Sequence, residues 1–167
     1  ECRLYAEDPE NDFMPVSGKI MYFETPKMEA LRIESAVKSG SEISIFYDPM
    51  IAKIIVWAQN RAEAHQKMAY ALQNIKCLGT ITNQNFLVNI VQNQDFNDGK
   101  YDTSFIAKNR EELVKKSDKT EVYIAALIWH IIKIQREQKL LKAMPMAWRN
   151  NFYQYQTLKL DDQLIKY

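Results

Sequence analysis

The segment MIAKIIVWA (residues 50–58) is apolar at every position except Lys53. A short apolar run rich in β-branched residues is typical of a central strand that is covered on both faces. Lys53 does not fit that pattern. The simplest interpretation is a lysine near the strand end, whose stem packs while its amine reaches water. A central strand needs neighbours, so the segment predicts a sheet built around it.

The chain before this segment supplies candidate neighbours. Glycine and proline separate short stretches rich in β-branched and aromatic residues, which are GKIMYF (18–23), ALRIESAV (30–37) and EISIFY (42–47). This spacing favours an antiparallel sheet over alternating βαβ units. We therefore expect an α+β fold, mainly an antiparallel sheet flanked by short helices.

The helices of this fold are expected after residue 58. Asn60 and Glu63 have the spacing of a capping box, and apolar residues then recur with helical period until the helix stops near Gly79. A second short helix is predicted to start at Thr82 or Asn83. A further helical segment is predicted within residues 103–108.

A charged stretch, KNREELVKKSDKT (108–120), divides the sequence near Lys115. We expect one domain over residues 1–115 and part of another over residues 116–167. Asp118 begins a second capping-box pattern, and a long helix is predicted over residues 118–142. Its apolar residues surround most of the helix, so something must enclose it. The one or two strands predicted after it, FYQYQTLKL and QLIKY, are too few to do so.

Composition narrows the possible partners. The chain of 167 residues is 47% hydrophobic, and its 22 basic and 21 acidic residues give a net charge of +1. A balanced charge argues against nucleic acid or an anionic membrane as the main partner. The run YIAALIWHII (123–132) is too short to cross a bilayer, which needs about 20 residues. Two isolated cysteines argue against a disulfide scaffold and favour an intracellular setting.

Few residues have the pattern of a catalytic or metal site. No glycine-rich phosphate loop occurs, so nucleotide chemistry would have to come from outside this chain. The acidic stretch EDPEND (7–12) could hold a metal, but adjacent carboxylates beside a proline more commonly form a solvated turn. Arg3 lies in an extended segment, where a guanidinium requires an anionic partner: a functional anion, or a structural pair with Glu7 or Glu34.

Five separated motifs together resemble one known family. They are ECRLYAEDPENDFMPVSGKI, RIES, YDPMIAKII, NRAEA and LGTITNQNFL. In this order and spacing they resemble the C-terminal domain of biotin carboxylase over residues 1 to about 108. The later helix and the motif MPMAWRNNFYQYQ are similar to the domain that links biotin carboxylase to carboxyltransferase in acyl-CoA carboxylase α subunits, especially of the propionyl-CoA type. In that family an antiparallel barrel encloses the long helix, so the chain would hold an incomplete helix-in-barrel domain.

The resemblance implies a division of chemistry between parts of the enzyme. In the family, an upstream ATP-grasp fold binds Mg-ATP and activates bicarbonate as carboxyphosphate, and biotin is then carboxylated. The arginine of the ECR motif places positive charge beside the biotin enolate and the phosphate, and Arg3 matches it. Asp48 and Lys53 match a motif near the cleft, where they are expected to support the site. No metal ligands are expected in this chain.

The resemblance also implies partners and a location. Arg32 matches an arginine at the subunit contact of dimeric biotin carboxylases. Glu29 replaces the aromatic residue common there, which argues against that dimer. Expected partners are the rest of biotin carboxylase, the biotin carboxyl carrier domain and the carboxyltransferase subunit. Biotin would be attached elsewhere and Mg-ATP bound upstream, so neither is expected on this chain. We expect an inactive fragment of a bacterial cytoplasmic or a mitochondrial matrix enzyme, with a scaffold or subunit-assembly module as the alternative. The exposed helix could also mediate self-association.

Overall fold

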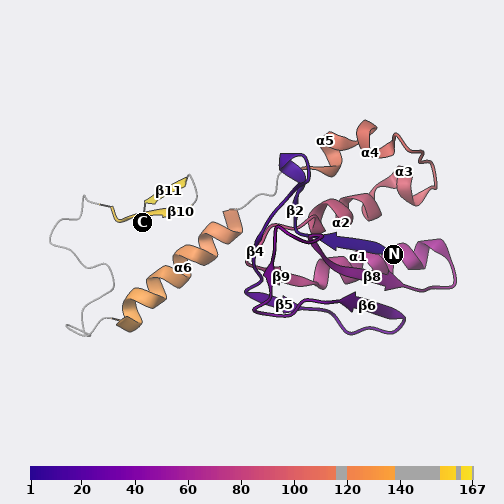
Figure 1. Cartoon of the computed structure of the whole chain (residues 1–167). Helices are drawn as coiled ribbons and strands as arrows, with labels where there is room; N and C mark the ends of the chain where they lie inside the picture. The colour runs from indigo at the N-terminus through magenta and orange to yellow at the C-terminus, as the bar shows by residue number, and fades with distance from the viewer. Residues whose placement is uncertain (116–119, 138–154, 161–162, 167) are drawn as a thin grey trace. The chain divides into compact units, whose positions relative to one another are not determined.

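The computed structural model describes residues 1–115, 120–137, 155–160 and 163–166. Its contacts divide the chain into two compact units, Glu1–Lys116 and Ser117–Tyr167, and each unit is described by itself. The described residues combine helices with small antiparallel sheets, which confirms the α+β fold class (Figure 1). None of the helices in these ranges is long and apolar enough to cross a membrane.

The first unit is built around a three-stranded antiparallel sheet. Strand β8 (Met50–Val56) lies between β1 (Cys2–Tyr5) and β6 (Leu31–Ser35), as the apolar segment predicts (Figure 1). Lys53 is in the middle of β8, paired with a residue on each side. The interpretation of Lys53 as a strand-end residue is therefore wrong, because the strand begins at Met50 and continues three residues past Lys53.

The remaining strands of this unit form short two-stranded ribbons. The pairs are β2 (Glu7–Asp8) with β3 (Met14–Pro15), β4 (Gly18–Lys19) with β7 (Glu42–Ile43), and β5 (Tyr22–Glu24) with β9 (Lys76–Leu78). The GKIMYF stretch is thus divided between two ribbons. The EISIFY stretch is a strand over two residues only, because a turn follows in which the Ser44 hydroxyl accepts from the Phe46 N–H.

Helix α1 (Arg61–Asn74) begins at the predicted capping box. Asn60 Oδ1 accepts from the Glu63 N–H at 2.9 Å, and Asn60 Nδ2 donates to Glu63 Oε1 at 2.7 Å. The helix ends five residues before Gly79, and the chain becomes extended at Ile75 and enters β9. The expected continuation to Gly79 is wrong because these residues pair with β5 instead.

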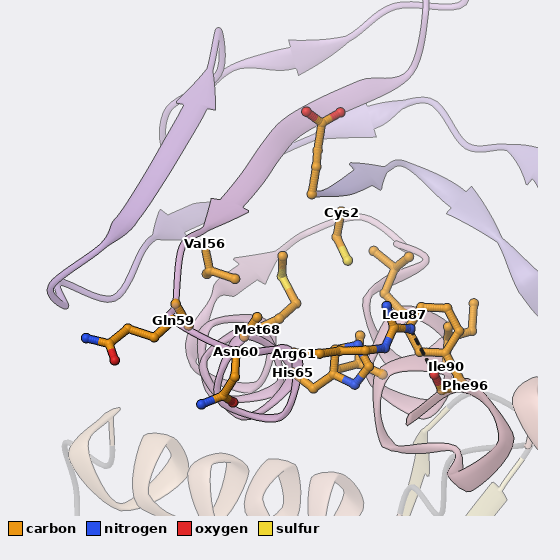
Figure 2. Close-up of a pocket in the computed structure, with 14 residues that line it drawn as sticks. Cys2, Val56, Gln59, Asn60, Arg61, His65, Met68, Leu87, Ile90 and Phe96 are labelled. Carbon is orange, nitrogen blue, oxygen red and sulfur yellow. Dashed lines mark hydrogen bonds between the residues drawn. The ribbon is translucent and has the colours of Figure 1, made fainter. Parts of the chain in front are cut away.

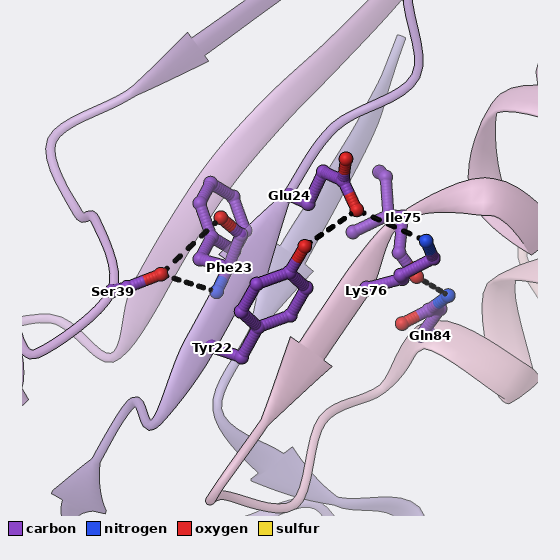
Figure 3. Close-up of polar contacts among 7 residues, drawn as sticks. All are labelled: Tyr22, Phe23, Glu24, Ser39, Ile75, Lys76 and Gln84. Atoms are coloured by element: carbon purple, nitrogen blue, oxygen red, sulfur yellow. Dashed lines mark hydrogen bonds and ion pairs between the residues drawn. The ribbon is translucent and has the colours of Figure 1, made fainter.

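The later helices of the first unit are short. They are η1 (Pro9–Asn11), α2 (Gln84–Gln92), α3 (Gln94–Asn97), α4 (Phe105–Lys108) and α5 (Arg110–Leu113). Helix α2 begins one residue after Asn83, as predicted. The Gln84 side-chain amide donates to the carbonyl oxygens of Leu72 and Ile75 at 2.6 and 2.9 Å, which satisfies acceptors at the end of α1 (Figure 3 shows the bond to Ile75).

The core of this unit lies between the sheet and helix α1. Leu4, Ala52 and Ile54 have at most 2% of their surface exposed, and they pack in one cluster with Met68 and Leu72 of α1. Neighbouring residues along β1 and β8 point to opposite faces, because side chains alternate in a strand. One face of the sheet is therefore buried under α1. The other face carries Arg3 and Lys53 together with Ile51, which is 1% exposed, so the expected cover on both faces of β8 is found at Ile51 but not along the whole strand.

The second unit contains helix α6 (Thr120–Glu137) and the hairpin of β10 (Thr157–Leu160) with β11 (Gln163–Lys166). No residue of α6 is buried. The helix agrees with the prediction over its described length, whereas the predicted helical residues 118–119 and 138–142 lie outside the described residues. The assignment of this unit to a linking domain stays a prediction.

Candidate functional site

The open face of the central sheet carries a row of charged side chains. The strand register places Arg3 opposite Lys53, and Lys53 opposite Glu34 of β6. These three residues come from distant parts of the sequence, and they alternate with the buried residues Leu4 and Ile54. Residues directly opposite on one face lie within reach of each other. The sheet therefore brings two cations and one carboxylate together.

Arg3 is the cation at the edge of this row. Its Nε donates to Glu1 Oε1 at 3.2 Å, and 58% of its side chain remains exposed. The bond to Glu1, and then the neighbouring Tyr5 hydroxyl, raise the pKa of Arg3. The structural alternatives of pairing with Glu7 or Glu34 are wrong, since the partner is Glu1. The i, i+2 spacing on an extended strand puts both side chains on one face and could have identified this pair.

Lys53 adds positive charge beside Arg3. The pKa of Glu1 is lowered, first by its hydrogen bond from Arg3 and more weakly by the charges of Arg3 and Lys53. This coupling shows that Lys53 acts on the same small region of the sheet. Lys53 is related to Arg3 through the pairing of their two strands. A supporting role of Lys53 in the site stays a prediction.

Asp48 lies in the turn that leads into β8. Its Oδ1 accepts from the Met50 N–H at 2.9 Å, an arrangement that fixes the turn. The pKa of Glu7 is raised by burial and, to a smaller extent, by the charge of Asp48. The described contacts thus connect Asp48 to the turn and to Glu7 rather than to Arg3, and its role in the cleft also stays a prediction.

Arg32 lies on β6, opposite Ile55. Its Nε is 3.3 Å from Glu34 Oε1, and its side chain is 70% exposed. An exposed pair of this kind contributes little stability. Arg32 is therefore accessible on the same face as Arg3, and its predicted place in a subunit contact stays untested.

Asn83 is a site residue that the sequence patterns marked only as a helix start. It is 6% exposed and lies against β1. Its side chain accepts from the Tyr5 N–H at 3.0 Å and donates to the Arg3 carbonyl oxygen at 3.3 Å. The cue available in sequence was weak, since a buried asparagine cannot be distinguished from a helix cap by local pattern.

A cavity of about 530 Å³ lies on the buried side of the sheet, beside α1 and α2 (Figure 2). Cys2, Met68 and Phe96 are among its lining residues. Burial raises the pKa of the Cys2 thiol, so the thiolate is disfavoured there. Arg3 follows Cys2 in the strand and does not line the cavity. Its partner Glu1 does line the cavity, so the cavity and the charged row adjoin at Glu1.

The acidic stretch at residues 7–12 forms a turn. Asp8 Oδ1 accepts from the Glu10 N–H at 3.0 Å, and Asp12 adopts a left-handed backbone with φ of 55° and pairs with Arg110 at 2.5 Å. Among the residues that the structure describes, no three His, Cys, Asp or Glu side chains are grouped to hold a metal. The interpretation of this stretch as a turn is confirmed.

The fold and the charged face define an α+β domain that presents an arginine from an edge strand. The biotin carboxylase C-terminal domain family matches residues 1–108. This chain of 167 residues belongs to that family.

Curated relatives agree with the family. The chain is 41% identical over 115 residues to the mitochondrial methylcrotonoyl-CoA carboxylase subunit alpha of Rattus norvegicus, covering 68% of this chain and 16% of the relative. It is 38% identical over 109 residues to the mitochondrial propionyl-CoA carboxylase alpha chain of Sus scrofa, covering 64% of this chain and 15% of the relative. The chain thus spans about a sixth of the length of these relatives.

Solved structures show the same fold. The biotin carboxylase domain of Hydrogenobacter thermophilus 2-oxoglutarate carboxylase has a TM-score of 0.67 at 35% identity, covering 70% of this chain and 26% of that one. A complete pyruvate carboxylase from Rhizobium etli has a TM-score of 0.74 at 30% identity, covering 81% of this chain and 12% of that one. Both structures cover more of this chain than residues 1–108, which the family matches.

Proposed function

We propose that this chain forms one wall of the carboxylation site in an ATP-dependent biotin carboxylase, within a biotin-dependent acyl-CoA carboxylase. The observation that carries the proposal is Arg3, half-exposed on the open sheet face within a domain of this family. The wider enzyme carboxylates biotin with ATP and bicarbonate through carboxyphosphate. This chain contributes charge and shape, while other parts of the enzyme bind the nucleotide.

Arg3 provides electrostatic stabilisation in this proposal. A guanidinium offers several N–H donors in a planar fork and stays charged at all physiological pH values. The bond from Nε to Glu1 restrains the side chain while most of it stays accessible. Such a preorganised donor lowers the energy of negative charge that develops during reaction. Lys53 increases the positive potential at the same place.

The residues of the open face fit an anionic group. Beside the carboxylates of Glu1 and Glu34 they supply a guanidinium and an ammonium in one row. These two cations suit a carboxylate, a phosphate or the oxygen of the biotin ureido ring. Biotin, when bound, supplies the ring nitrogen that accepts the carboxyl group. The described residues do not fit Mg²⁺, because they contain no cluster of metal ligands. In this proposal Mg-ATP binds to the upstream part of the enzyme.

The proposed partners are the rest of biotin carboxylase, the biotin carboxyl carrier domain and the carboxyltransferase subunit. Support comes from the relatives, which are described as carboxylase α subunits. Residues 116–167 are proposed to belong to the linking domain, and the wide coverage by a complete pyruvate carboxylase supports this. The mitochondrial matrix is the proposed location if the source is eukaryotic, since the eukaryotic relatives are mitochondrial.

The experiment uses the complete subunit that contains this chain. We expect Arg3→Ala to lower kcat for bicarbonate-dependent ATP cleavage by about 100- to 1000-fold, as for loss of one preorganised donor. Arg3→Lys should lose nearly as much, because a point charge does not replace the planar fork. Arg110→Ala is the matched control, since Arg110 also pairs with a carboxylate at an exposed position.

The alternative function is a scaffold for subunit assembly without a catalytic contribution. The exposed apolar residues of α6 favour it, since Ile128 and Trp129 are 52% and 62% exposed. Normal ATP cleavage by both Arg3 variants would contradict the catalytic proposal and leave the scaffold as the explanation.

A further inference from the structure

We infer that Asn83 is a positioning residue that holds Arg3 in place, an inference that rests on the proposed function. Asn83 precedes α2 and is separated from Arg3 by 80 residues in sequence. It does not lie on the charged face and does not contact a substrate in this proposal. Its effect is exerted through the backbone of β1.

The argument begins with the position of β1 in the sheet. Strand order β1-β8-β6 makes β1 an edge strand, so the outward backbone groups of Arg3 and Tyr5 have no strand beside them. Unpaired backbone groups at partly buried positions are costly and leave an edge free to move. The pairing with β8 is also irregular between Leu4 and Tyr5, where the register shifts. Strand pairing alone therefore holds Arg3 weakly.

Asn83 replaces the missing strand at this point. Its Oδ1 accepts from the Tyr5 N–H at 3.0 Å, its Nδ2 donates to the Arg3 carbonyl oxygen at 3.3 Å, and its backbone N–H donates to the Tyr5 carbonyl oxygen at 3.1 Å. A carboxamide has one acceptor and one donor side by side, which match a carbonyl and an N–H two residues apart on a strand edge.

The bonds of Asn83 are shielded from water. The residue is 6% exposed, and every buried side-chain polar atom in the described residues has a hydrogen-bond partner. Removing the amide would leave the partly buried Tyr5 N–H and Arg3 carbonyl oxygen of β1 without this partner. The strand segment carrying Arg3 could then shift, and a misplacement of about 1 Å at a reacting group can reduce a rate by about 100-fold.

The test is a double-mutant cycle in the complete subunit. Asn83→Ala is expected to lower kcat for bicarbonate-dependent ATP cleavage by about 10- to 100-fold, with the KM for ATP unchanged. The double variant Arg3→Ala/Asn83→Ala should lose no more than Arg3→Ala alone, because no guanidinium remains to be misplaced. Multiplicative losses would overturn the inference.

Asn93→Ala is the matched control. Asn93 is 9% exposed and its side chain caps α3 by accepting from the Phe96 N–H at 3.2 Å, away from β1. We expect it to lower Tm as Asn83→Ala does, while kcat stays near the starting value. An equal loss of kcat in both variants would show a merely structural effect and overturn the inference.

Asn83→Asp covers the case in which Asn83→Ala does not fold. It keeps the size and the acceptor for Tyr5 but loses the donor to the Arg3 carbonyl. A normal kcat in this variant would overturn the inference as well. An unaffected Arg3→Ala subunit would instead refute the proposed function, so the two failures are distinguishable.

Discussion

At the scale of single residues, the ion-pair partner of a side chain is harder to predict from the sequence than its candidate role. Arg3 was identified from its motif, but its partner is Glu1, two residues away, rather than Glu7 or Glu34. Glu34 does lie in the same row, on the far side of Lys53. Strand register is a property of the folded chain, so no local pattern could place Lys53 between the two.

A pH-dependent prediction belongs to this scale. The pKa of Asp102 is lowered to about 2, first by the Ser104 hydroxyl, then by the Ser104 N–H and by Lys108. A lowered carboxyl pKa stabilises the fold above the ordinary value of about 3.8, and that contribution is lost as pH falls through about 2. Carboxyl-carbon NMR should show Asp102 still ionised at about pH 3.

The Ser104 hydroxyl, which is the largest cause of the lowered Asp102 pKa, gives a control for this prediction. Ser104→Ala should move the Asp102 titration toward its ordinary value by more than Lys108→Ala does, since the hydroxyl acts more strongly than the ammonium. A larger change in the lysine variant would contradict the assignment. The hydrogen bond from Ser104 N to Asp102 Oδ1, at 2.8 Å, persists in both.

At the scale of elements, strong local signals predicted well and weak ones did not. Strand β8 and the capped start of α1 follow directly from an apolar run and a capping box. Strand β9 is not predicted, because Leu78 follows Ile75 with the spacing of the apolar residues of α1. Its pairing with β5 is supported by the Lys76–Glu24 ion pair at 3.0 Å, to which Tyr22 also donates (Figure 3). Such pairing depends on residues about fifty positions apart.

Gly79 gives a prediction about how these ribbons meet. It has φ of +106°, and an added Cβ would lie 2.4 Å from the Lys19 carbonyl oxygen and 2.7 Å from the Met21 nitrogen. Both backbone strain and a clash with main chain oppose any side chain here. Gly79→Ala should lower the free energy of unfolding by about 3 kcal/mol or more.

Gly99→Ala is the control for Gly79. Gly99 also has positive φ, at +75°, but nothing lies within 4 Å of an added Cβ. Only the backbone strain remains, so Gly99→Ala is expected to lower the free energy of unfolding by about 1 kcal/mol. Urea denaturation of both variants measures the difference. Equal losses would mean that the close approach at Gly79 is not required.

At the scale of the whole molecule, the two units differ in how far the sequence explains them. The first unit has a buried core and a family match over residues 1–108. The second has a helix with no buried residue, and the motif MPMAWRNNFYQYQ lies mainly outside the described residues. Sequence patterns predict that α6 needs a cover, but they cannot identify the cover, because the pattern of a helix describes only its own surface.

The chain alone is therefore predicted to self-associate. Burial of a large apolar side chain is worth about 1.5–3 kcal/mol, and Ile124 and Ile128 of α6 are each 52% exposed. Sedimentation should show an average mass that rises with concentration. Ile128→Glu should reduce the rise, whereas Gln135→Glu, which adds the same charge to the same helix, should not. A concentration-independent monomer would contradict this prediction.

The central claim is that Arg3 acts in biotin carboxylation, and reconstitution tests it most directly. The measurement is bicarbonate-dependent ATP cleavage after the upstream ATP-binding part of the enzyme is mixed with this chain. We predict that activity appears on mixing and is lost with Arg3→Ala and with Arg3→Lys, while Arg110→Ala retains it. Activity that is restored equally by the chain with and without Arg3 would contradict the claim.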